Sequence, residues 1–460
     1  MSGRSAVEDR IEAGRFNSWL YPFYHRGTAV NQWLRRRIRP AGMGLLLLGV
    51  VLGCLAGGQA SDPVFRLFSF GFSLGCLSLL WLPFRRVRIE VKRDVPAHAT
   101  VGEPVRIRYH VTNRGRSLRN AWLLETPPDP RPDFERFLLT PEPGESKRNA
   151  FDRFFIYYRW NWLCESRLIY EPRPSEQALK LRRGETGSFV AELLPRRRGL
   201  VALDDLRVLL PDPLGLYQRC RRVKAPESGL AILPRRYRLP PFELPGSARF
   251  QPGGDATSRN AGPSGEFVGL RDYQPGDPPR LIHWKSWART GRPIVKELED
   301  SFFPRHGLIL DTFPEAGDLA LFEEAVSVAA SFVSSIDTHE CLIDLMFISG
   351  AERVVTAGRG TGRAESLLEV LAGVESSPRP QFDSLRKLVL RHSEDLAGCL
   401  AVFCGWSEER REMLSRISGT GIEIAAIVVC EEVPAARPPG VHFVRASHPA
   451  EDLMRLPGKL

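Results

Sequence analysis

The residues best suited to chemistry lie in one segment, Gly269–Glu299, whose sequence is GLRDYQPGDPPRLIHWKSWARTGRPIVKELE. Pro275 followed by Gly276 predicts a turn, because proline fixes φ at the first central position and glycine accepts a positive φ at the second. Asp277 comes directly after this turn. Its carboxylate is therefore placed to accept hydrogen bonds from backbone N–H groups or from Arg280.

The same segment combines these polar groups with aromatic residues. Trp284 and Ala288 are four residues apart, so a short helix would place both on one buried side. Several cations accompany one carboxylate, which is typical of an ion-pair network joining two domains, or of a site for an anionic ligand or acidic partner. We favour the network or docking surface, since structural networks commonly hold such clusters. Its candidate members are Arg271, Tyr273, Gly276, Asp277, Arg280, Trp284, Lys285 and Arg289.

These residues also carry a family resemblance. The pattern R-x-Y-x-P-G-D-x-x-R-x-I-x-W-K-x-x-A-R resembles the signature of the bacterial family called domain of unknown function 58, with His283 where many relatives carry Asp. The stretch PRRRGLVALDDLRVLLPDPLGLY resembles the same family. The resemblance implies a membrane-anchored N-terminus, a von Willebrand factor A-like C-terminal domain and a MoxR-type AAA+ ATPase as partner. It implies no known activity.

Composition narrows the function classes. The chain has 460 residues, which favours two or three domains, and a net charge of +10 that is spread along the chain. It lacks zinc-ligand spacing, an aromatic RNA-binding signature and a persuasive helix-turn-helix, so we expect no nucleic-acid partner. Its eight cysteines include no C-x-x-C pair and favour reduced thiols in a cytosolic protein.

Two charge-free apolar stretches, Pro40–Ser61 and Leu67–Phe84, predict a hairpin of two transmembrane helices within residues 40–84. Glycines recur at four-residue spacing in both and would let the helices pack closely. Basic residues precede the first span and follow the second, which predicts that both termini and the soluble domains are cytoplasmic at a bacterial inner membrane. The leader, residues 1–39, contains an aromatic segment, Phe16–Trp33, that would lie among lipid headgroups or be disordered.

Residues 85–238 alternate apolar and polar side chains and predict a β-sandwich-like domain. An insertion at about 127–174 fits this pattern poorly. It is dense in aromatic residues and arginine, and we expect a hairpin added to the sheet, with contact to the membrane surface as the alternative. Residues 239–265, rich in Pro, Gly and Ser, predict a linker to the signature segment, residues 266–302.

Residues 303–460 alternate strands and helices, which predicts an α/β Rossmann-like domain with a mostly parallel sheet. By the family resemblance this domain would be von Willebrand A-like. Ligands of such sheets bind at the carboxyl ends of strands, which directs attention to Asp311.

Asp311 and Thr312 correspond to the start of the Asp-x-Ser-x-Ser metal motif of von Willebrand A domains, but Phe313 and Glu315 stand where that motif has serines. We therefore expect a degenerate site without a cofactor, with Asp311 as a helix cap or turn residue and Mg²⁺ binding as the alternative. Two further enzyme-like features are weaker. The glycine-rich loop 358–362 lacks the ending of a phosphate loop, and Cys404 would need His392 or His442 as its base.

The sequence therefore predicts a non-enzymatic scaffold or adaptor, bound to membrane lipid and to a protein partner. The alternatives are an anion- or nucleotide-binding protein that uses the cluster between Arg271 and Arg289, and a metal-dependent binding module at Asp311.

Overall fold

The computed structural model describes residues 3–55, 63–246, 266–299, 304–315, 318–336, 341–358, 364–377, 380–434 and 437–459. The side chains of residues 3–18, 139, 146, 266–268 and 297–299 lie outside this description, as do much of the expected linker and the glycine-rich loop from residue 359. The chain forms two compact units. Unit 1 comprises Met1–Arg236, Pro314–Ala330 and Leu368–Ser376, and unit 2 comprises Tyr237–Phe313, Ser331–Leu367 and Ser377–Leu460.

Unit 1 begins with three helices, α1 (Gly3–Arg35), α2 (Pro40–Leu55) and α3 (Pro63–Trp81), the last continued by the 3₁₀ turn η1 (Leu82–Phe84). One described helix, Pro63–Phe84, is long and apolar enough to cross a membrane, with a mean hydropathy of 1.7; Pro40–Leu55 is apolar but shorter. The remainder of the first expected span, from residue 56, lies outside the described residues.

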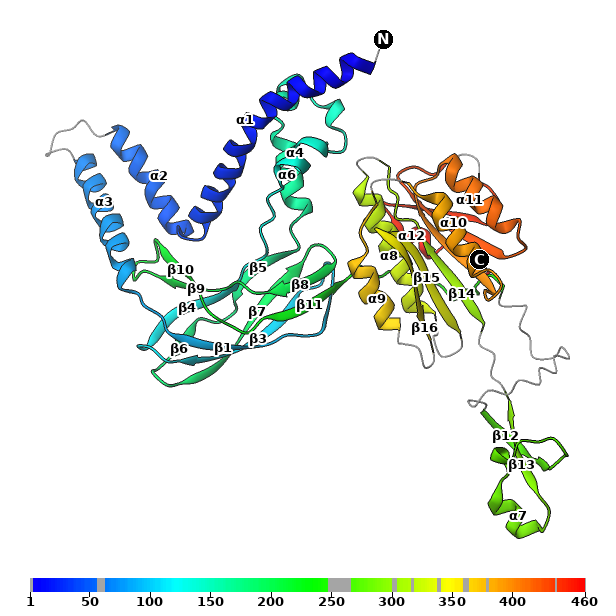
Figure 1. Cartoon of the computed structure of the whole chain (residues 1–460). Helices are drawn as coiled ribbons and strands as arrows, with labels where there is room; N and C mark the ends of the chain where they lie inside the picture. The colour runs from blue at the N-terminus through cyan, green and yellow to red at the C-terminus, as the bar shows by residue number, and fades with distance from the viewer. Residues whose placement is uncertain are drawn as a thin grey trace. The chain divides into compact units, whose positions relative to one another are not determined.

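Helices α2 and α3 pack against each other (Figure 1). A Cβ at Gly53 would lie 3.5 Å from the Phe68 ring, and one at Gly71 would lie 3.4 Å from Leu45. At each of these two positions the glycine faces a large side chain of the neighbouring helix, so the absence of a side chain on the glycine lets the two helices pack closely. Gly49, by contrast, has open space around it.

The rest of unit 1 is mainly β-structure. Its strands form three sheets, ordered β1-β3-β7-β5, β10-β9-β4-β6 and β2-β11-β8. The strands are β1 (Ile89–Asp94), β2 (His98–Thr100), β3 (Val105–Asn113), β4 (Leu118–Glu125), β5 (Tyr170–Ser175), β6 (Leu179–Leu181), β7 (Thr186–Pro195), β8 (Gly199–Leu203), β9 (Leu206–Pro211), β10 (Gln218–Arg222) and β11 (Ser228–Leu233).

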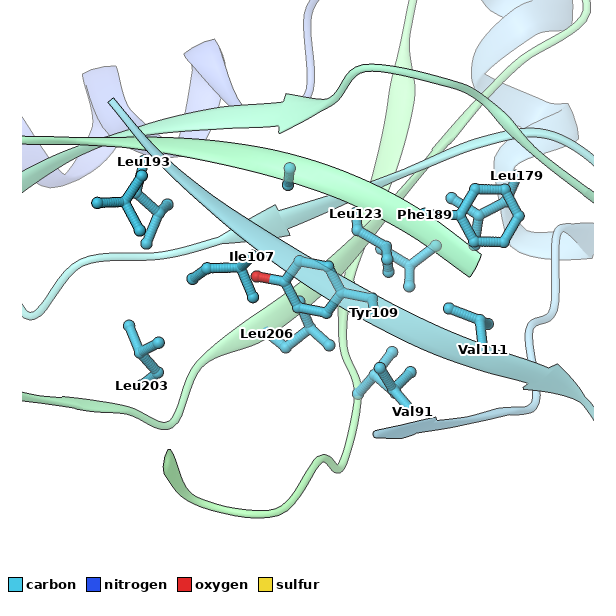
Figure 2. Close-up of a cluster of buried hydrophobic side chains, with 14 of the residues drawn as sticks. Val91, Ile107, Tyr109, Val111, Leu123, Leu179, Phe189, Leu193, Leu203 and Leu206 are labelled. Atoms are coloured by element: carbon cyan, nitrogen blue, oxygen red, sulfur yellow. The ribbon is translucent and has the colours of Figure 1, made fainter. Parts of the chain in front are cut away.

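These three sheets share one apolar core (Figure 2). Strand β3 contributes Ile107, Tyr109 and Val111, which alternate with more exposed residues as the two-residue period of a strand requires. Leu123 from β4 and Leu206 from β9 are fully buried in the same cluster. Each such aliphatic side chain stabilises the fold by about 1.5–3 kcal/mol on burial.

The insertion between β4 and β5 is helical, so the hairpin expected there is wrong. It contains α4 (Phe134–Leu139), η2 (Glu145–Lys147), α5 (Ala150–Phe155) and α6 (Tyr157–Ser166). The Asn149 side chain accepts a hydrogen bond from the N–H of Asp152 and caps α5. Trp160 and Leu163, three residues apart on α6, are buried on one face, which is helical rather than strand spacing. Their cluster includes Leu20 of α1, a partner distant in sequence.

Unit 2 contains a six-stranded sheet ordered β16-β15-β14-β17-β18-β19, in which only the β15–β16 pair is antiparallel. Numbered from its first strand, this order is 3-2-1-4-5-6, the doubly wound arrangement, with its topological switch between β14 and β17. The strands are β14 (Arg305–Leu310), β15 (Leu342–Ser349), β16 (Ala351–Ala357), β17 (Gly398–Cys404), β18 (Glu423–Cys430) and β19 (Val441–Arg445).

The described helices after residue 303 are α8 (Leu319–Ser335), α9 (Ala364–Gly373), α10 (Phe382–Arg391), α11 (Glu408–Ser418) and α12 (Pro449–Leu453). Leu385 of α10 and Met413 of α11 share an apolar core with Ile309 of β14 and Phe403 of β17. The strands and helices expected from the sequence after residue 303 are thus present in the described residues.

The signature segment forms a small module of its own elements (Figure 1). Strands β12 (Glu266–Asp272) and β13 (Ile294–Glu299) pair antiparallel, with the turn η4 (Pro279–Leu281) and helix α7 (Trp284–Thr290) between them. Among the residues whose side chains are described here, Val295 is the one that is fully buried. The module therefore has little apolar core.

Candidate functional site

The signature module is organised by one ion pair. Asp277 accepts two hydrogen bonds from the guanidinium of Arg271, at 2.8 and 2.7 Å, and a third from the N–H of Gln274 at 2.8 Å. The hydrogen bonds from Arg271, and then the one from Gln274, hold the pKa of Asp277 below its usual range. Gly276, in the turn, has φ of +111°, a conformation that favours glycine. This ion pair therefore ties the turn to the end of β12.

The cations do not converge as the sequence suggested. Asp277 is bound by Arg271 and not by Arg280, since the turn between them places Arg280 on η4 with its side chain exposed. Lys285 and Arg289 are also exposed, one helical turn apart on α7. Within the described part of the chain, no carboxylate pairs with these three cations. They form an open positive surface rather than a closed network.

The expected burial of Trp284 and Ala288 is wrong. Trp284 is 64% exposed, and Ala288 is exposed on the same side of α7. Helix α7 has only seven residues, and the module is too small to cover both of its faces. Trp284 instead stacks on Trp287, with ring centroids 5.3 Å apart and planes inclined by 19°.

Backbone contacts hold this aromatic pair in place. His283 precedes α7, donates its N–H to the carbonyl of Ile294 at 2.8 Å, and lies 2.7 Å from the Ser286 hydroxyl through Nδ1. The N–H of Tyr273 is bonded to the carbonyl of Pro293 at 3.0 Å. Tyr273 therefore contributes to the sheet pairing of the module, while Trp284 is presented outward.

A second candidate site lies at the topological switch of the six-stranded sheet. Asp311, directly after β14, is buried and forms an ion pair with Arg410 of α11, with Nε 2.7 Å from Oδ2. The same carboxylate accepts the N–H of Phe313 at 2.8 Å and that of Cys404 at 3.2 Å. From the sequence, we expected Asp311 to be either a helix cap or a turn residue. Its carboxylate bonds the N–H two residues later, as a turn residue does, and it does not cap a helix.

The donors around Asp311 do not fit Mg²⁺. Both carboxylate oxygens already accept hydrogen bonds, and the Arg410 guanidinium supplies the positive charge. The Thr312 hydroxyl donates to the carbonyl of Ile348. Burial raises the pKa of Asp311, and the nearby Arg410 opposes this effect. Burial also disfavours the charged form of Arg410, but the Asp311 carboxylate outweighs burial, so the pKa of Arg410 is raised. In the described ranges there is no group of three or more His, Cys, Asp or Glu residues that could hold a metal ion.

Arg410 is a residue that sequence reasoning missed. It shares the buried face of α11 with Met413 and Ile417, at positions i, i+3 and i+7. A cation on an otherwise apolar helical stripe was the available signal, because such a residue must find a buried partner.

Cys404 does not have the surroundings of a nucleophile. Burial, and then the Asp311 carboxylate, raise the pKa of its thiol, which keeps it protonated. Its sulfur lies 3.3 Å from Oδ2 of Asp311 and 3.7 Å from the Arg410 guanidinium. In the described structure, neither His392 nor His442 makes a hydrogen bond with it.

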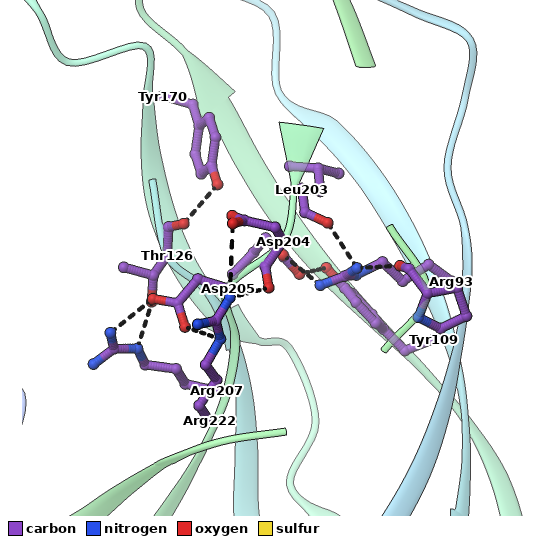
Figure 3. A network of polar contacts seen from close by, with 11 residues as sticks. Arg93, Tyr109, Thr126, Tyr170, Leu203, Asp204, Asp205, Arg207 and Arg222 are labelled. Atoms are coloured by element: carbon purple, nitrogen blue, oxygen red, sulfur yellow. Dashed lines mark hydrogen bonds and ion pairs between the residues drawn. The ribbon is translucent and has the colours of Figure 1, made fainter. Parts of the chain in front are cut away.

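A further buried ion pair lies in the β-domain of unit 1 (Figure 3). Arg93 of β1 has a buried side chain that pairs with Glu125 at 2.7 Å. Arg93 also donates to the carbonyl of Leu203, and Tyr109 donates to Glu125 at 3.1 Å. Burial raises the pKa of Glu125, partly offset by Arg93. The partners of Arg93 and Glu125 named here all lie inside the β-domain, which indicates a structural role for this network.

The turn between β9 and β10 contacts the apolar helices directly. Asp212 accepts hydrogen bonds from the N–H groups of Leu214 and Tyr217 and from the buried hydroxyl of Ser78 in α3. The segment just before α2 pairs with the same turn, as the N–H of Arg39 donates to the carbonyl of Leu216 at 3.0 Å. The stretch that resembled the family thus joins the β-domain to α2 and α3.

Comparison with known proteins supports the resemblance for part of the chain. Residues 269–452 match a family model described as "Protein of unknown function DUF58". The "Uncharacterized protein YeaD" of Bacillus subtilis (strain 168) is 31% identical over 103 residues, which cover 22% of this chain and 25% of that relative. The match therefore spans about a quarter of the relative's length.

A solved structure of Pseudomonas fluorescens alkylpurine DNA glycosylase AlkC, bound to DNA containing an abasic site analog, matches with 13% identity. The match covers 39% of this chain and 42% of that chain, with a TM-score of 0.17. A similarity of this size carries no argument about fold or function.

Proposed function

We propose that this chain, whose residues 269–452 belong to the DUF58 family, is a non-enzymatic, membrane-anchored adaptor that docks an acidic protein partner on its signature module. The observation that carries the proposal is the exposed Trp284 of α7, which stacks on the half-buried Trp287 and is flanked by exposed cations. Those cations are Arg280, Lys285 and Arg289.

This combination suits recognition of a protein surface. Tryptophan and arginine are the residue types most enriched at the energetic centres of interfaces, because they bury large areas and make directed contacts. Lysine and arginine with no carboxylate partner in the described chain attract an acidic surface and speed its approach. Arg271, in contrast, is engaged by Asp277 and positions the module.

The anchor in this proposal is the apolar helix pair α2–α3 at a bacterial inner membrane. Basic residues on both sides of the pair favour cytoplasmic soluble domains by the positive-inside rule. After the second helix these basic residues include Arg85, Arg86 and Arg88. Arg93, further along the chain, is buried in the β-domain and does not count toward this charge. By the family resemblance, the expected partner is a MoxR-type AAA+ ATPase.

The anion-binding alternative has less support from the geometry. A phosphate site needs several donors directed at one point, whereas Arg271 is paired and Arg280 lies exposed on a separate turn. It predicts a thermal shift with nucleotides that Arg280→Ala abolishes, and no shift across a nucleotide panel would remove it. The metal-binding alternative requires the Asp311 carboxylate as a ligand, but this carboxylate is already paired with Arg410.

Photo-crosslinking in native membranes tests the docking surface. A p-benzoyl-phenylalanine in place of the exposed Ala288 leaves both tryptophans intact, and the same group in place of the exposed Leu200 of β8 is the matched control. We expect the AAA+ ATPase to crosslink from position 288 and not from position 200. Equal crosslinking from both positions, or none from 288, would contradict the proposal.

A further inference from the structure

Helix α1 has an inner face that is already used. Leu20 is buried in a cluster with Phe137 of α4 and Trp160 of α6. Tyr24 donates its hydroxyl to the carbonyl of Phe155 at 2.7 Å, and Trp160 donates its indole N–H to the Thr28 hydroxyl at 2.8 Å. This face holds α1 against the helical insertion, so the helix does not depend on another molecule to keep its orientation.

The opposite face of α1 carries a second apolar stripe. Its members follow at spacings of four, seven and three residues, which places them on one side of a helix. They are Trp19, Phe23, Val30 and Trp33, with 67, 67, 55 and 52% of their surfaces exposed. Arg26 lies in the same row, three residues after Phe23, and is exposed. A helix with apolar residues on both faces needs a second environment for the outer one.

The outer stripe is continuous along the chain with the apolar helix pair. Helix α1 ends at Arg35 and α2 begins at Pro40, and α2 exposes Leu47 and Val51 among other apolar side chains. Arg35 and Arg37 lie exposed between the two helices. The Arg37 guanidinium sits 4.4 Å from the centre of the Trp33 ring. Cations at the end of an aromatic stripe match the negative charge of lipid headgroups.

The insertion adds aromatic residues to the same helical assembly. Phe151 and Phe154 of α5 and Tyr157 of α6 are exposed, and Arg153 lies among them. Tryptophan, tyrosine and phenylalanine next to arginine are characteristic of the boundary between headgroups and acyl chains, where one end of the side chain is wet and the other is apolar.

We infer that the outer stripe of α1 binds the headgroup–acyl boundary of an anionic bilayer, as a second membrane contact beside the α2–α3 pair. The inference rests on the membrane anchor of the proposed function. The inner face of α1 fixes the helix to α4 and α6, and the outer face presents Phe23 and Trp33 to lipid. The β-domain insertion is thereby held at the membrane surface.

Lipid photolabelling of the full-length protein tests this surface. The protein is reconstituted in vesicles of phosphatidylcholine and phosphatidylglycerol that contain a trace of diazirine-acyl phosphatidylcholine, and its tryptic peptides are compared. Peptides 16–26 and 27–35 carry the stripe, peptide 67–85 carries α3, and peptide 199–207 carries the exposed Leu200 of the β-domain as the negative control.

We expect lipid adducts on 16–26 and 27–35 at least fivefold above those on 199–207, together with adducts on 67–85. Trp33→Ser should lower the adducts on 27–35 severalfold, while Asn31→Ser, at an exposed position of the same peptide, leaves them unchanged. Adducts on 67–85 alone would overturn the inference and leave the anchor standing. Absence of adducts from 67–85 as well would refute the anchor itself.

Discussion

Arginine residues of this chain have opposite roles that depend on burial. Arg410 and Arg93 are buried and each pairs with a buried carboxylate, whereas Arg280 and Arg289 are exposed without a carboxylate partner in the described chain. The sequence directed attention to Asp311, which the structure places, buried, directly after β14. It could not identify Arg410 as its partner, because 99 residues separate the two and only the fold brings them together.

Arg410→Met should strongly destabilise unit 2, because it leaves the Asp311 carboxylate buried without its counter-charge. The expected cost is about 3–5 kcal/mol. Hydrogen exchange of β14 and β17 amides in the full-length protein measures it.

The neighbouring Arg411→Met is the matched control for that substitution. Arg411 pairs with Glu408 on the exposed side of α11 and should change stability by no more than about 0.5 kcal/mol. Equal effects of the two substitutions would show that the buried ion pair does not stabilise the sheet end.

At the scale of elements, the periodicity of apolar residues predicted those strands and helices whose buried face can be read from their own sequence. The alternation of β3 and the strand–helix order after residue 303 were readable because each element buries a face of its own period. The insertion was not, because its burial depends on α1, more than a hundred residues earlier. The exposure of Trp284 was missed for a related reason: spacing on a helix shows which residues share a face, not whether anything covers it.

The junction between α2 and the β9–β10 turn gives a prediction at this scale. A Cβ at Gly42 would lie 2.1 Å from the carbonyl oxygen of Leu216, so Gly42→Ala must separate the helix from the turn. We expect faster hydrogen exchange at the amides of Arg39 and Gln218, which bond across this junction.

Gly44→Ala serves as its control, since nothing lies within 4 Å of the added methyl group and alanine favours a helix. Exchange at the junction should match that of the unsubstituted protein. If Gly42→Ala behaves like Gly44→Ala, the turn does not hold α2 as the contacts indicate.

At the scale of the whole molecule, the proposed adaptor has its apolar helices at one end of the chain and its docking module in the middle. Both roles were expected from the sequence and stay predictions, while the family match to residues 269–452 agrees with the signature. The signature residues nevertheless divide into two roles. Arg271, Gly276 and Asp277 shape the module, while Trp284, Lys285 and Arg289 are presented outward. Only the structure separates these roles, because both groups share one short motif.

Quantitative recovery of the AAA+ ATPase with the full-length protein from native membranes tests the docking claim most directly. The triple variant Arg280→Ala, Lys285→Ala, Arg289→Ala removes the exposed cations of the module, and the variant Lys180→Ala, Arg183→Ala, Arg353→Ala removes three exposed cations elsewhere. The account predicts at least tenfold lower recovery with the first variant and unchanged recovery with the second. Equal recovery with both variants would contradict it.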